Sequence, residues 1–189
     1  MTAPAAAPSI ETAATTSRPV GTSRLHTSEP RWPTAQPPLD PSARSLVVVA
    51  GASSGAQASS ATWIAAAQAQ GLTVELVASE PGAVGAALAA ATAGTRLVVA
   101  GDEATIARTL AAAIGAGLVA TEVRAHLTDP DGPRTVQCVH CKAITETTAP
   151  VDGECACAGC DRPLLIFPHY SRRIGAYLGF RIDSEELPA

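Results

Sequence analysis

The sequence predicts a small, open, parallel α/β sheet flanked by helices, followed by a C-terminal four-cysteine unit of the zinc-ribbon type. Two observations lead to this fold class. Short β-branched segments alternate with alanine-rich segments of helical length between residues 45 and 127. Two Cys-x-x-Cys pairs then follow in the last third of the chain. We therefore expect an N-terminal arm over residues 1–44, an α/β domain over 45–130 and a cysteine domain over 134–189.

The first 44 residues are rich in alanine and proline, and they predict an arm without a core of its own. Met1–Thr16 has no hydrophobic periodicity, so we expect it to be disordered. Six prolines between residues 17 and 43 exclude a regular helix there. Two interpretations of this stretch stay open: a plain linker, or an extended arm that docks Trp32 on this protein or on a partner.

The α/β prediction starts at Ser45–Ala50, a continuous apolar run that ends in Gly51 and is typical of a buried parallel strand. The further elements that we expect are a helix over 61–70, a strand over 72–77, a helix over 83–93, a strand over 96–100, a helix from 102 or 103 to about 116, and a strand over 119–127. Strands that alternate with helices of this length predict a parallel sheet with right-handed crossovers. A turn-rich hinge over 128–133 then leads to the cysteine segment.

The loop after the first strand is the candidate nucleotide contact. Glycine-rich loops at the carboxyl end of a strand often hold phosphates against the next helix, which makes Gly51, Ser53, Ser54 and Gly55 candidate cofactor-binding residues. The loop matches neither G-x-G-x-x-G nor a P-loop, so a plain tight turn is an equal alternative. His126 is the one histidine in the sheet region, and we expect no catalytic residue there.

Charge and hydropathy exclude several classes. The net charge is −4 and Lys142 is the one lysine, which argues against a nucleic-acid partner. No stretch approaches the roughly 20 apolar residues of a membrane span. The first ten residues lack the features of a secretory signal, so we expect a cytoplasmic protein, in which clustered cysteines are metal ligands more often than disulfides.

Cys138, Cys141, Cys157 and Cys160 form the pattern C-x2-C-x15-C-x2-C, which predicts a four-thiolate metal site. Each pair turns tightly enough for two thiolates to bind one ion, and two such knuckles complete a tetrahedron. Because a segment of about 50 residues has little core, the metal is expected to stabilise its fold. Gly159 is expected to supply a positive φ inside the second knuckle.

Alternatives to this ligand set remain. Cys155 and His140 lie close enough in sequence to replace a ligand, but the matched spacing of the two pairs favours neither. Four free thiols or a disulfide pair fit the spacing and the compartment less well. Zinc is favoured over a rubredoxin-type iron because neither knuckle has the proline and glycine that are common in rubredoxin knuckles.

The tail His169–Phe180 combines aromatic residues with two adjacent arginines in a chain that is only 3% aromatic. One interpretation is that Ile174, Tyr177 and Leu178 pack as one face of a helix. The other is a contact with a partner or cofactor, because tyrosine and arginine are favoured in interfaces. The candidate contact residues are Trp32, His169, Tyr170, Arg172, Arg173 and Tyr177.

With these motifs in view, the stretch from Cys138 to Phe180, which contains CVHCKA, CAGC and PLLIFPHYSRRIGAYLGF, resembles the C-terminal zinc-ribbon region of the small, DmmA-type subunit of bacterial dimethylamine monooxygenase. Ser17–Val20 and the strand at Ser45 resemble that family more weakly. The sheet is also similar to the nicotinamide-binding half of ferredoxin reductases, although Ala100–Asp102 replaces the usual Cys-Gly-Pro, and the Thr-Pro of the first loop is missing.

These resemblances imply a complex in the bacterial cytoplasm. A reductase subunit with FMN and a 2Fe-2S cluster would pass electrons from NADPH to a haem oxygenase subunit, which would convert dimethylamine and O2 to methylamine and formaldehyde. The present chain would be an accessory subunit without catalytic residues. Two alternatives stay open: a nicotinamide-binding or electron-transfer component in its own right, and a stand-alone zinc-ribbon adaptor.

Overall fold

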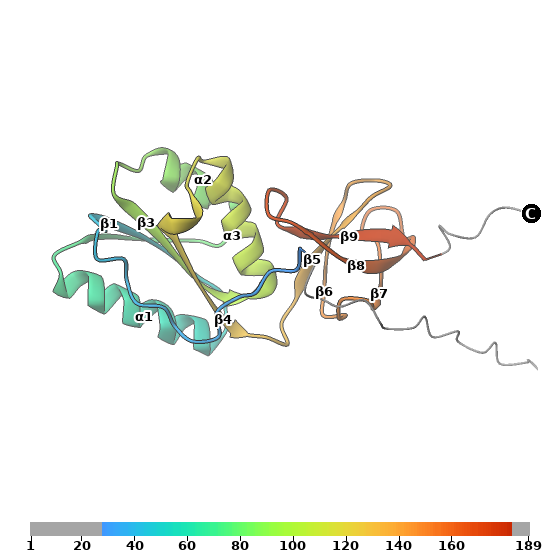
Figure 1. Ribbon diagram of the computed structural model, residues 1–189, viewed down its shortest axis with the longest axis horizontal. Coiled ribbons are helices and arrows are strands. Elements are labelled where there is room, and N and C mark those ends of the chain that lie inside the picture. The colour runs from blue at the N-terminus through green and yellow to red at the C-terminus, as the bar shows by residue number, and fades with distance from the viewer. Residues whose placement is uncertain (1–27, 183–189) are drawn as a thin grey trace, which may run out of the picture.

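The structure is a computed structural model that describes residues 28–182. The expectations for Met1–Thr16 and for Ser17–Val20 fall outside the described residues. Two β-sheets follow one another along the chain and lie side by side in space (Figure 1). We refer to residues 45–129 as the α/β unit and to residues 134–182 as the cysteine unit.

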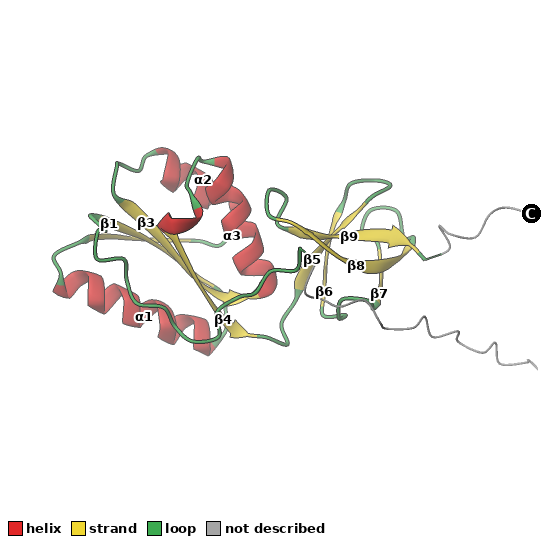
Figure 2. Cartoon of the chain, viewed as in Figure 1, coloured by secondary structure: helices red, strands yellow, loops and turns green. Residues whose placement is uncertain are grey.

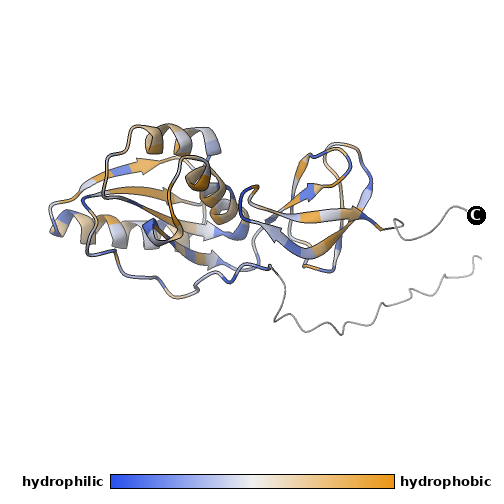
Figure 3. Ribbon diagram, turned by 45° about the horizontal axis from the view of Figure 1, so that its top comes forward, coloured by the Kyte–Doolittle hydropathy of each residue, from blue (hydrophilic) through white to orange (hydrophobic). Residues whose placement is uncertain are grey.

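The first sheet is parallel throughout, which confirms the predicted α/β class. Its strands are β1 (Ser45–Ala50), β2 (Thr73–Val77), β3 (Thr95–Asp102) and β4 (Val123–Asp129), in the order β2-β1-β3-β4. The two inner strands are buried along most of their length. Figure 3 shows them as apolar ribbons between the helices.

Helix α1 (Ser54–Ala69) covers one face of this sheet, and α2 (Pro81–Ala89) and α3 (Glu103–Gly115) cover the other (Figure 1). Successive side chains along each strand point to opposite faces of the sheet. Val47 and Val99 pack towards α2 and α3, whereas Leu46 and Val98 pack towards α1. Of the helices described, none is long and apolar enough to cross a bilayer.

Several element boundaries differ from prediction; α2, for example, ends at Ala89 and not at 93. Helix α1 begins seven residues before its expected start, because the Ser53 hydroxyl accepts a hydrogen bond from the amide of Ala56 and caps the helix there. The expected strand over 119–127 begins later, at Val123. A 3₁₀ turn over Ala120–Glu122 precedes it, held by the Glu122 carboxylate, which accepts from the amide of Val119.

The second sheet belongs to the cysteine unit and curls into a barrel-like form (Figure 2). Its strands are β5 (Arg134–Cys138), β6 (Ile144–Thr147), β7 (Glu154–Ala156), β8 (Pro163–Ser171) and β9 (Ala176–Arg181), in the order β6-β5-β9-β8-β7. The helical interpretation of Ile174–Leu178 is wrong. Gly175, at a φ of 70°, turns the chain back so that Tyr177 pairs with Tyr170 across the β8–β9 hairpin.

The arm over residues 28–44 runs along the α/β unit in an extended form. Its carbonyls accept from the amide of Leu127 at 2.8 Å and from the Trp63 indole at 2.9 Å. Arg96 donates to Asp40 at 2.8 Å and holds the pKa of that carboxyl well below its usual range. The arm therefore docks on this chain and is not a free linker.

Helix α3 and the arm join the two units. The carboxylate of Glu103 accepts a 2.7 Å hydrogen bond from the Tyr177 hydroxyl and lies 3.6 Å from Arg134. Trp32 packs against both cores and meets the Tyr170 ring edge to face, with centroids 6.1 Å apart. A Cβ on Gly175 would lie 2.5 Å from the carbonyl oxygen of Ala107, so the β8–β9 turn sits directly on α3.

Candidate metal centre

Two knuckles of the same backbone design hold the four predicted thiols. The first, Cys138–Cys141, links β5 to β6, and the second, Cys157–Cys160, links β7 to β8. In the first, the amide of Lys142 donates to the Cys138 carbonyl at 3.0 Å, and in the second the amide of Asp161 donates to the Cys157 carbonyl at 3.0 Å. Each knuckle therefore turns its two thiols towards the same side.

The positive φ angles fall one residue after each knuckle. Lys142 has a φ of 66° and Asp161 a φ of 54°. The expectation that Gly159 supplies a positive φ is wrong. Gly159 is required for another reason, because a Cβ there would lie 2.6 Å from the Cβ of Ala143 and 3.2 Å from Cys141 Sγ. The glycine lets the second knuckle approach the first.

The thiol spacing fits a tetrahedral metal. Sγ of Cys138 lies 3.9 Å from Sγ of Cys160, and Sγ of Cys141 lies 3.5 Å from Sγ of Cys157. Zn–S bonds of about 2.3 Å place tetrahedral sulphurs about 3.8 Å apart, which matches these distances, whereas a disulfide needs about 2.05 Å. All five cysteines are free. The donor set therefore suits zinc.

The neighbouring thiols at this site shift one another's pKa values. The amide of Gly159 donates to Cys157 Sγ at 3.4 Å and is the main cause that lowers the pKa of this thiol to about 6. The amide of Arg162 acts to lower the pKa of Cys160, but burial and the neighbouring thiols outweigh it and raise that pKa to about 12. One thiolate forms readily and discourages the next, so a bound cation would be needed to hold four.

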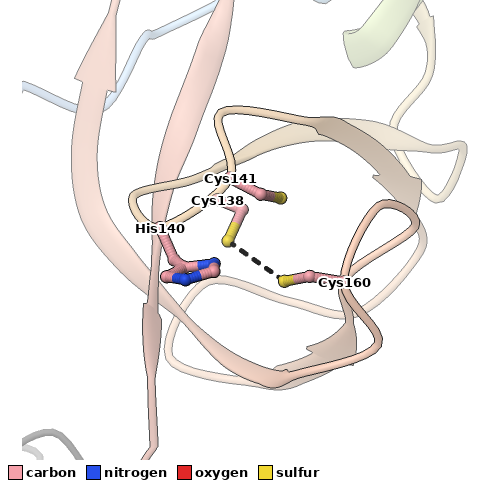
Figure 4. A group of neighbouring side chains, drawn as sticks. All are labelled: Cys138, His140, Cys141 and Cys160. Atoms are coloured by element: carbon pink, nitrogen blue, oxygen red, sulfur yellow. Dashed lines mark hydrogen bonds between the residues drawn. The ribbon is translucent and has the colours of Figure 1, made fainter.

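His140 also reaches the site, while Cys155 lies beside it. Ligand atoms of Cys138, His140, Cys141 and Cys160 all lie within 4.8 Å of one another. Figure 4 shows the His140 ring and Cys160 on either side of the Cys138 sulphur. Burial is the main cause that raises the pKa of Cys155, followed by the nearby Cys157.

The candidate nucleotide loop lies at the carboxyl end of β1, and its glycines have contacts within the chain. A Cβ on Gly51 would lie 3.2 Å from the Cα of Gly101, and one on Gly55 would lie 3.3 Å from the Cβ of Thr128. Ser53 caps α1, and Ser54 is its exposed first residue. Close packing within the chain is therefore enough to explain why both positions are glycine, without a bound nucleotide.

The candidate contact residues divide by burial. Tyr170 and Tyr177 are buried within this chain, and Trp32 is half-buried. His169, Arg172 and Arg173 are exposed at or near the β8–β9 turn. The structure therefore brings the aromatic residues together in the interior and leaves the basic ones on the surface.

Two features had little or no signal in the sequence. Glu103 gives only the ordinary signal of an acid at a helix start, yet it binds Tyr177 across the two units. The other feature is an apolar face on the second sheet, where strand pairing places Phe167 beside Leu178 and Leu165 beside Phe180. We define the apolar face by its members: Ile144, Leu165, Phe167, Leu178, Phe180 and Ile182, which directly follows β9. Gln137 of β5 lies between Ile144 and Leu178.

The apolar face is open to solvent. Ile144, Phe167 and Ile182 are 43%, 40% and 45% exposed. Phe167 and Phe180 pack edge to face with centroids 5.6 Å apart, and they are the only phenylalanines in the sequence. Large apolar side chains that line up on an exposed sheet face often mark a contact surface.

Four thiols on two matched knuckles, joined to a parallel α/β unit, fit the zinc-ribbon class of protein. Residues 135–180 match the family described as dimethylamine monooxygenase subunit DmmA-like, C-terminal domain, which confirms the resemblance noted in the sequence. This segment spans nearly the whole cysteine unit, from β5 to β9.

A curated relative supports the same assignment. The chain is 39% identical over 93 residues to the heme-dependent oxidative N-demethylase delta subunit of Ectopseudomonas mendocina (strain ymp). The match covers 49% of this chain and 51% of that protein, so the chain spans about half the length of this relative. No solved structure matches the chain.

Proposed function

We propose that this protein is an accessory, non-catalytic subunit of a multi-component monooxygenase in the bacterial cytoplasm. The complex would demethylate dimethylamine to methylamine and formaldehyde with NADPH and O2, using FMN, 2Fe-2S and haem on its reductase and oxygenase subunits. The observation that carries the proposal is the match of residues 135–180 to the DmmA-like C-terminal domain. The delta subunit of an oxidative N-demethylase, 39% identical over 93 residues, supports it.

Zinc has a structural role in this proposal. Cys138, Cys141, Cys157 and Cys160 would hold the ion, which would fix the two knuckles against each other and stabilise the cysteine unit. Since structural zinc sites are closed by four protein ligands, no open position for substrate is expected. Iron in the same site is the less favoured alternative.

The contact surface for the other subunits is proposed on the cysteine unit. The apolar face would form its centre, and His169, Arg172 and Arg173 would lie at its margin. Interfaces commonly combine an apolar centre with a polar rim, and arginine is favoured in them. Tyr170, Tyr177 and Trp32 would contribute by holding the hairpin in place from inside.

Co-expression of the full chain with the reductase and oxygenase subunits tests this function. The tagged chain is expected to co-purify with both subunits and with their haem and flavin absorbance. Phe167→Ser should reduce the recovered haem, whereas Leu76→Ser, which changes an even more exposed apolar residue on the α/β unit, should not. A chain that purifies alone would contradict the proposal and would favour a stand-alone adaptor.

A second candidate function rests on the strand order. From β1 the chain adds β2 on one side of the sheet and then β3 and β4 on the other side. Parallel sheets often bind nucleotides at the point between two strands where this switch occurs, here between β1 and β3. The Gly51–Gly55 loop lies there, as it would in a shortened ferredoxin-reductase half that binds NADPH. Calorimetric titration with NADPH tests this candidate, and an absence of binding heat would rule it out.

A further inference from the structure

His140 occupies a position that a simple four-cysteine site does not require. It lies in the first knuckle, between Cys138 and Cys141, and its side chain is exposed. One of its ring nitrogens nevertheless lies within 4.8 Å of the sulphurs of Cys138, Cys141 and Cys160 (Figure 4). These three thiols together with one imidazole make up a complete zinc ligand set, Cys₃His.

Cys157 lies beside two of the same three thiols. Its sulphur is 3.5 Å from Cys141 Sγ, and it also contacts Cys160. Cys157 is buried, whereas His140 is exposed. Three thiols therefore have two neighbours that could complete a tetrahedron, one from the interior and one from the solvent side.

We propose that His140 is an alternative fourth ligand, so that the centre can hold zinc as Cys₄ through Cys157 or as Cys₃His through His140. The inference rests on the proposed zinc site and extends it by naming a fifth donor. Both ligand sets are common for structural zinc. Replacing a thiolate by a neutral imidazole changes the net charge of the centre from −2 to −1 without opening a position to water.

The wild-type form is Cys₄. The two knuckles share one backbone geometry, and the amide of Gly159 stabilises the Cys157 thiolate. His140 takes its place when Cys157 is lost to mutation or oxidation. The three thiols that remain then keep the ion, and the cysteine unit stays folded.

Four variants of the full chain test the proposal: His140→Ala, Cys157→Ala, the double variant, and Cys155→Ala as a matched control for loss of a nearby cysteine. Zinc per chain is measured after dialysis, and cobalt(II) is the spectroscopic probe, because its absorbance reports the number of thiolate ligands. Cys157→Ala is expected to retain about one zinc per chain and to give a three-thiolate cobalt spectrum. The Cys155→Ala and His140→Ala variants are expected to keep the wild-type spectrum.

The double variant decides the role of His140. It is expected to bind zinc roughly 100-fold more weakly than Cys157→Ala or worse, because one of four ligands carries a large share of the binding free energy. Equal zinc affinity and equal cobalt spectra of these two variants would overturn the proposal, since water would then be the fourth ligand. A Cys157→Ala chain that stays unfolded or metal-free with zinc present would overturn it too.

Failure of the zinc site itself is distinguishable. A wild-type chain that binds neither zinc nor cobalt would refute the metal centre and the inference together. Wild-type binding with no binding by Cys157→Ala would refute only the inference and would leave a plain Cys₄ centre.

Discussion

Gly159 lies where the two knuckles meet, and it has no room for a side chain. A Cβ at this position would lie 2.6 Å from the Cβ of Ala143 and 3.2 Å from Cys141 Sγ. Neither neighbour can move easily, because Ala143 accepts from the amide of Cys138 and Cys141 is a proposed ligand. The residue therefore sets the distance between the two pairs of thiols.

Gly159→Ala is expected to destabilise the cysteine unit by about 1–3 kcal/mol, the usual cost of overpacking, and to weaken zinc binding. Denaturant unfolding of the zinc-loaded protein and competition with a chelator measure the two effects. Gly85→Ala is the control, because nothing lies within 4 Å of its new Cβ and helix α2 should gain up to about 1 kcal/mol. Equal stability of the two variants would contradict this role of Gly159.

At the scale of elements, the β8–β9 hairpin is attached to the rest of the chain through its two tyrosines. Burial is the main cause that raises the pKa of both Tyr170 and Tyr177, and the hydrogen bond to Glu103 adds to the shift at Tyr177. These are the only tyrosines in the sequence. Tyrosinate absorbance therefore reports directly on the hairpin and its contact with α3.

A spectrophotometric titration should find both tyrosines protonated in the folded protein at about pH 10, where an unfolded chain has half of its tyrosines ionised. Because the folded pKa values are raised, the stabilisation is complete below about pH 10 and is lost as the pH rises further. The free energy of unfolding should therefore fall above that pH. Tyrosinate absorbance of the native protein with a midpoint near pH 10 would contradict the buried hairpin.

The contrast between the two sheets explains how far the sequence could predict the elements. Runs such as Ser45–Ala50 fill a strand that is buried on both faces, so hydrophobicity alone identifies it. The β8 strand has no such signal, because its Pro163–Ser171 sequence mixes buried and exposed positions and contains a bulge near Tyr170. Its pairing with β9 depends on the hairpin turn at Gly175. The spacing of Ile174, Tyr177 and Leu178 around this turn also fits one face of a helix.

The cysteine cluster was predictable to a similar degree. Regular spacing identified Cys138, Cys141, Cys157 and Cys160, whose sulphurs the fold brings together. The sequence marked both His140 and Cys155 as possible replacement ligands but could not choose between them, because the approach of His140 depends on how the first knuckle folds over the three thiols. The apolar face was not predictable for a related reason, since its members come from β6, β8, β9 and the residue after β9, and the order of these strands is not encoded locally.

At the scale of the whole molecule, the cores show which part depends on the metal. Two clusters, around Val49 and around Trp63, are built from the α/β unit and the arm. The third is built from the cysteine unit and includes two of the proposed ligands, Cys138 and Cys157. Trp32 packs against the first and third clusters, and Ala107 of α3 belongs to the third, so the two units meet through α3 and the arm while most of each core comes from one unit.

Cys138→Ser, or removal of zinc by a chelator, is expected to unfold the cysteine unit and leave the α/β unit folded. Structural zinc contributes on the order of 10–16 kcal/mol, more than the core of a unit of about 50 residues can replace. Every α-helix of the described residues lies in the α/β unit, so the helical circular dichroism signal should persist while the strand contribution falls. The α/β unit should also become less stable by about 1–3 kcal/mol, because Glu103 loses the Tyr177 hydroxyl and Trp32 loses Tyr170. Cys155→Ser is the matched control and should change neither signal, whereas loss of the helical signal together with the metal would mean that the two units fold as one.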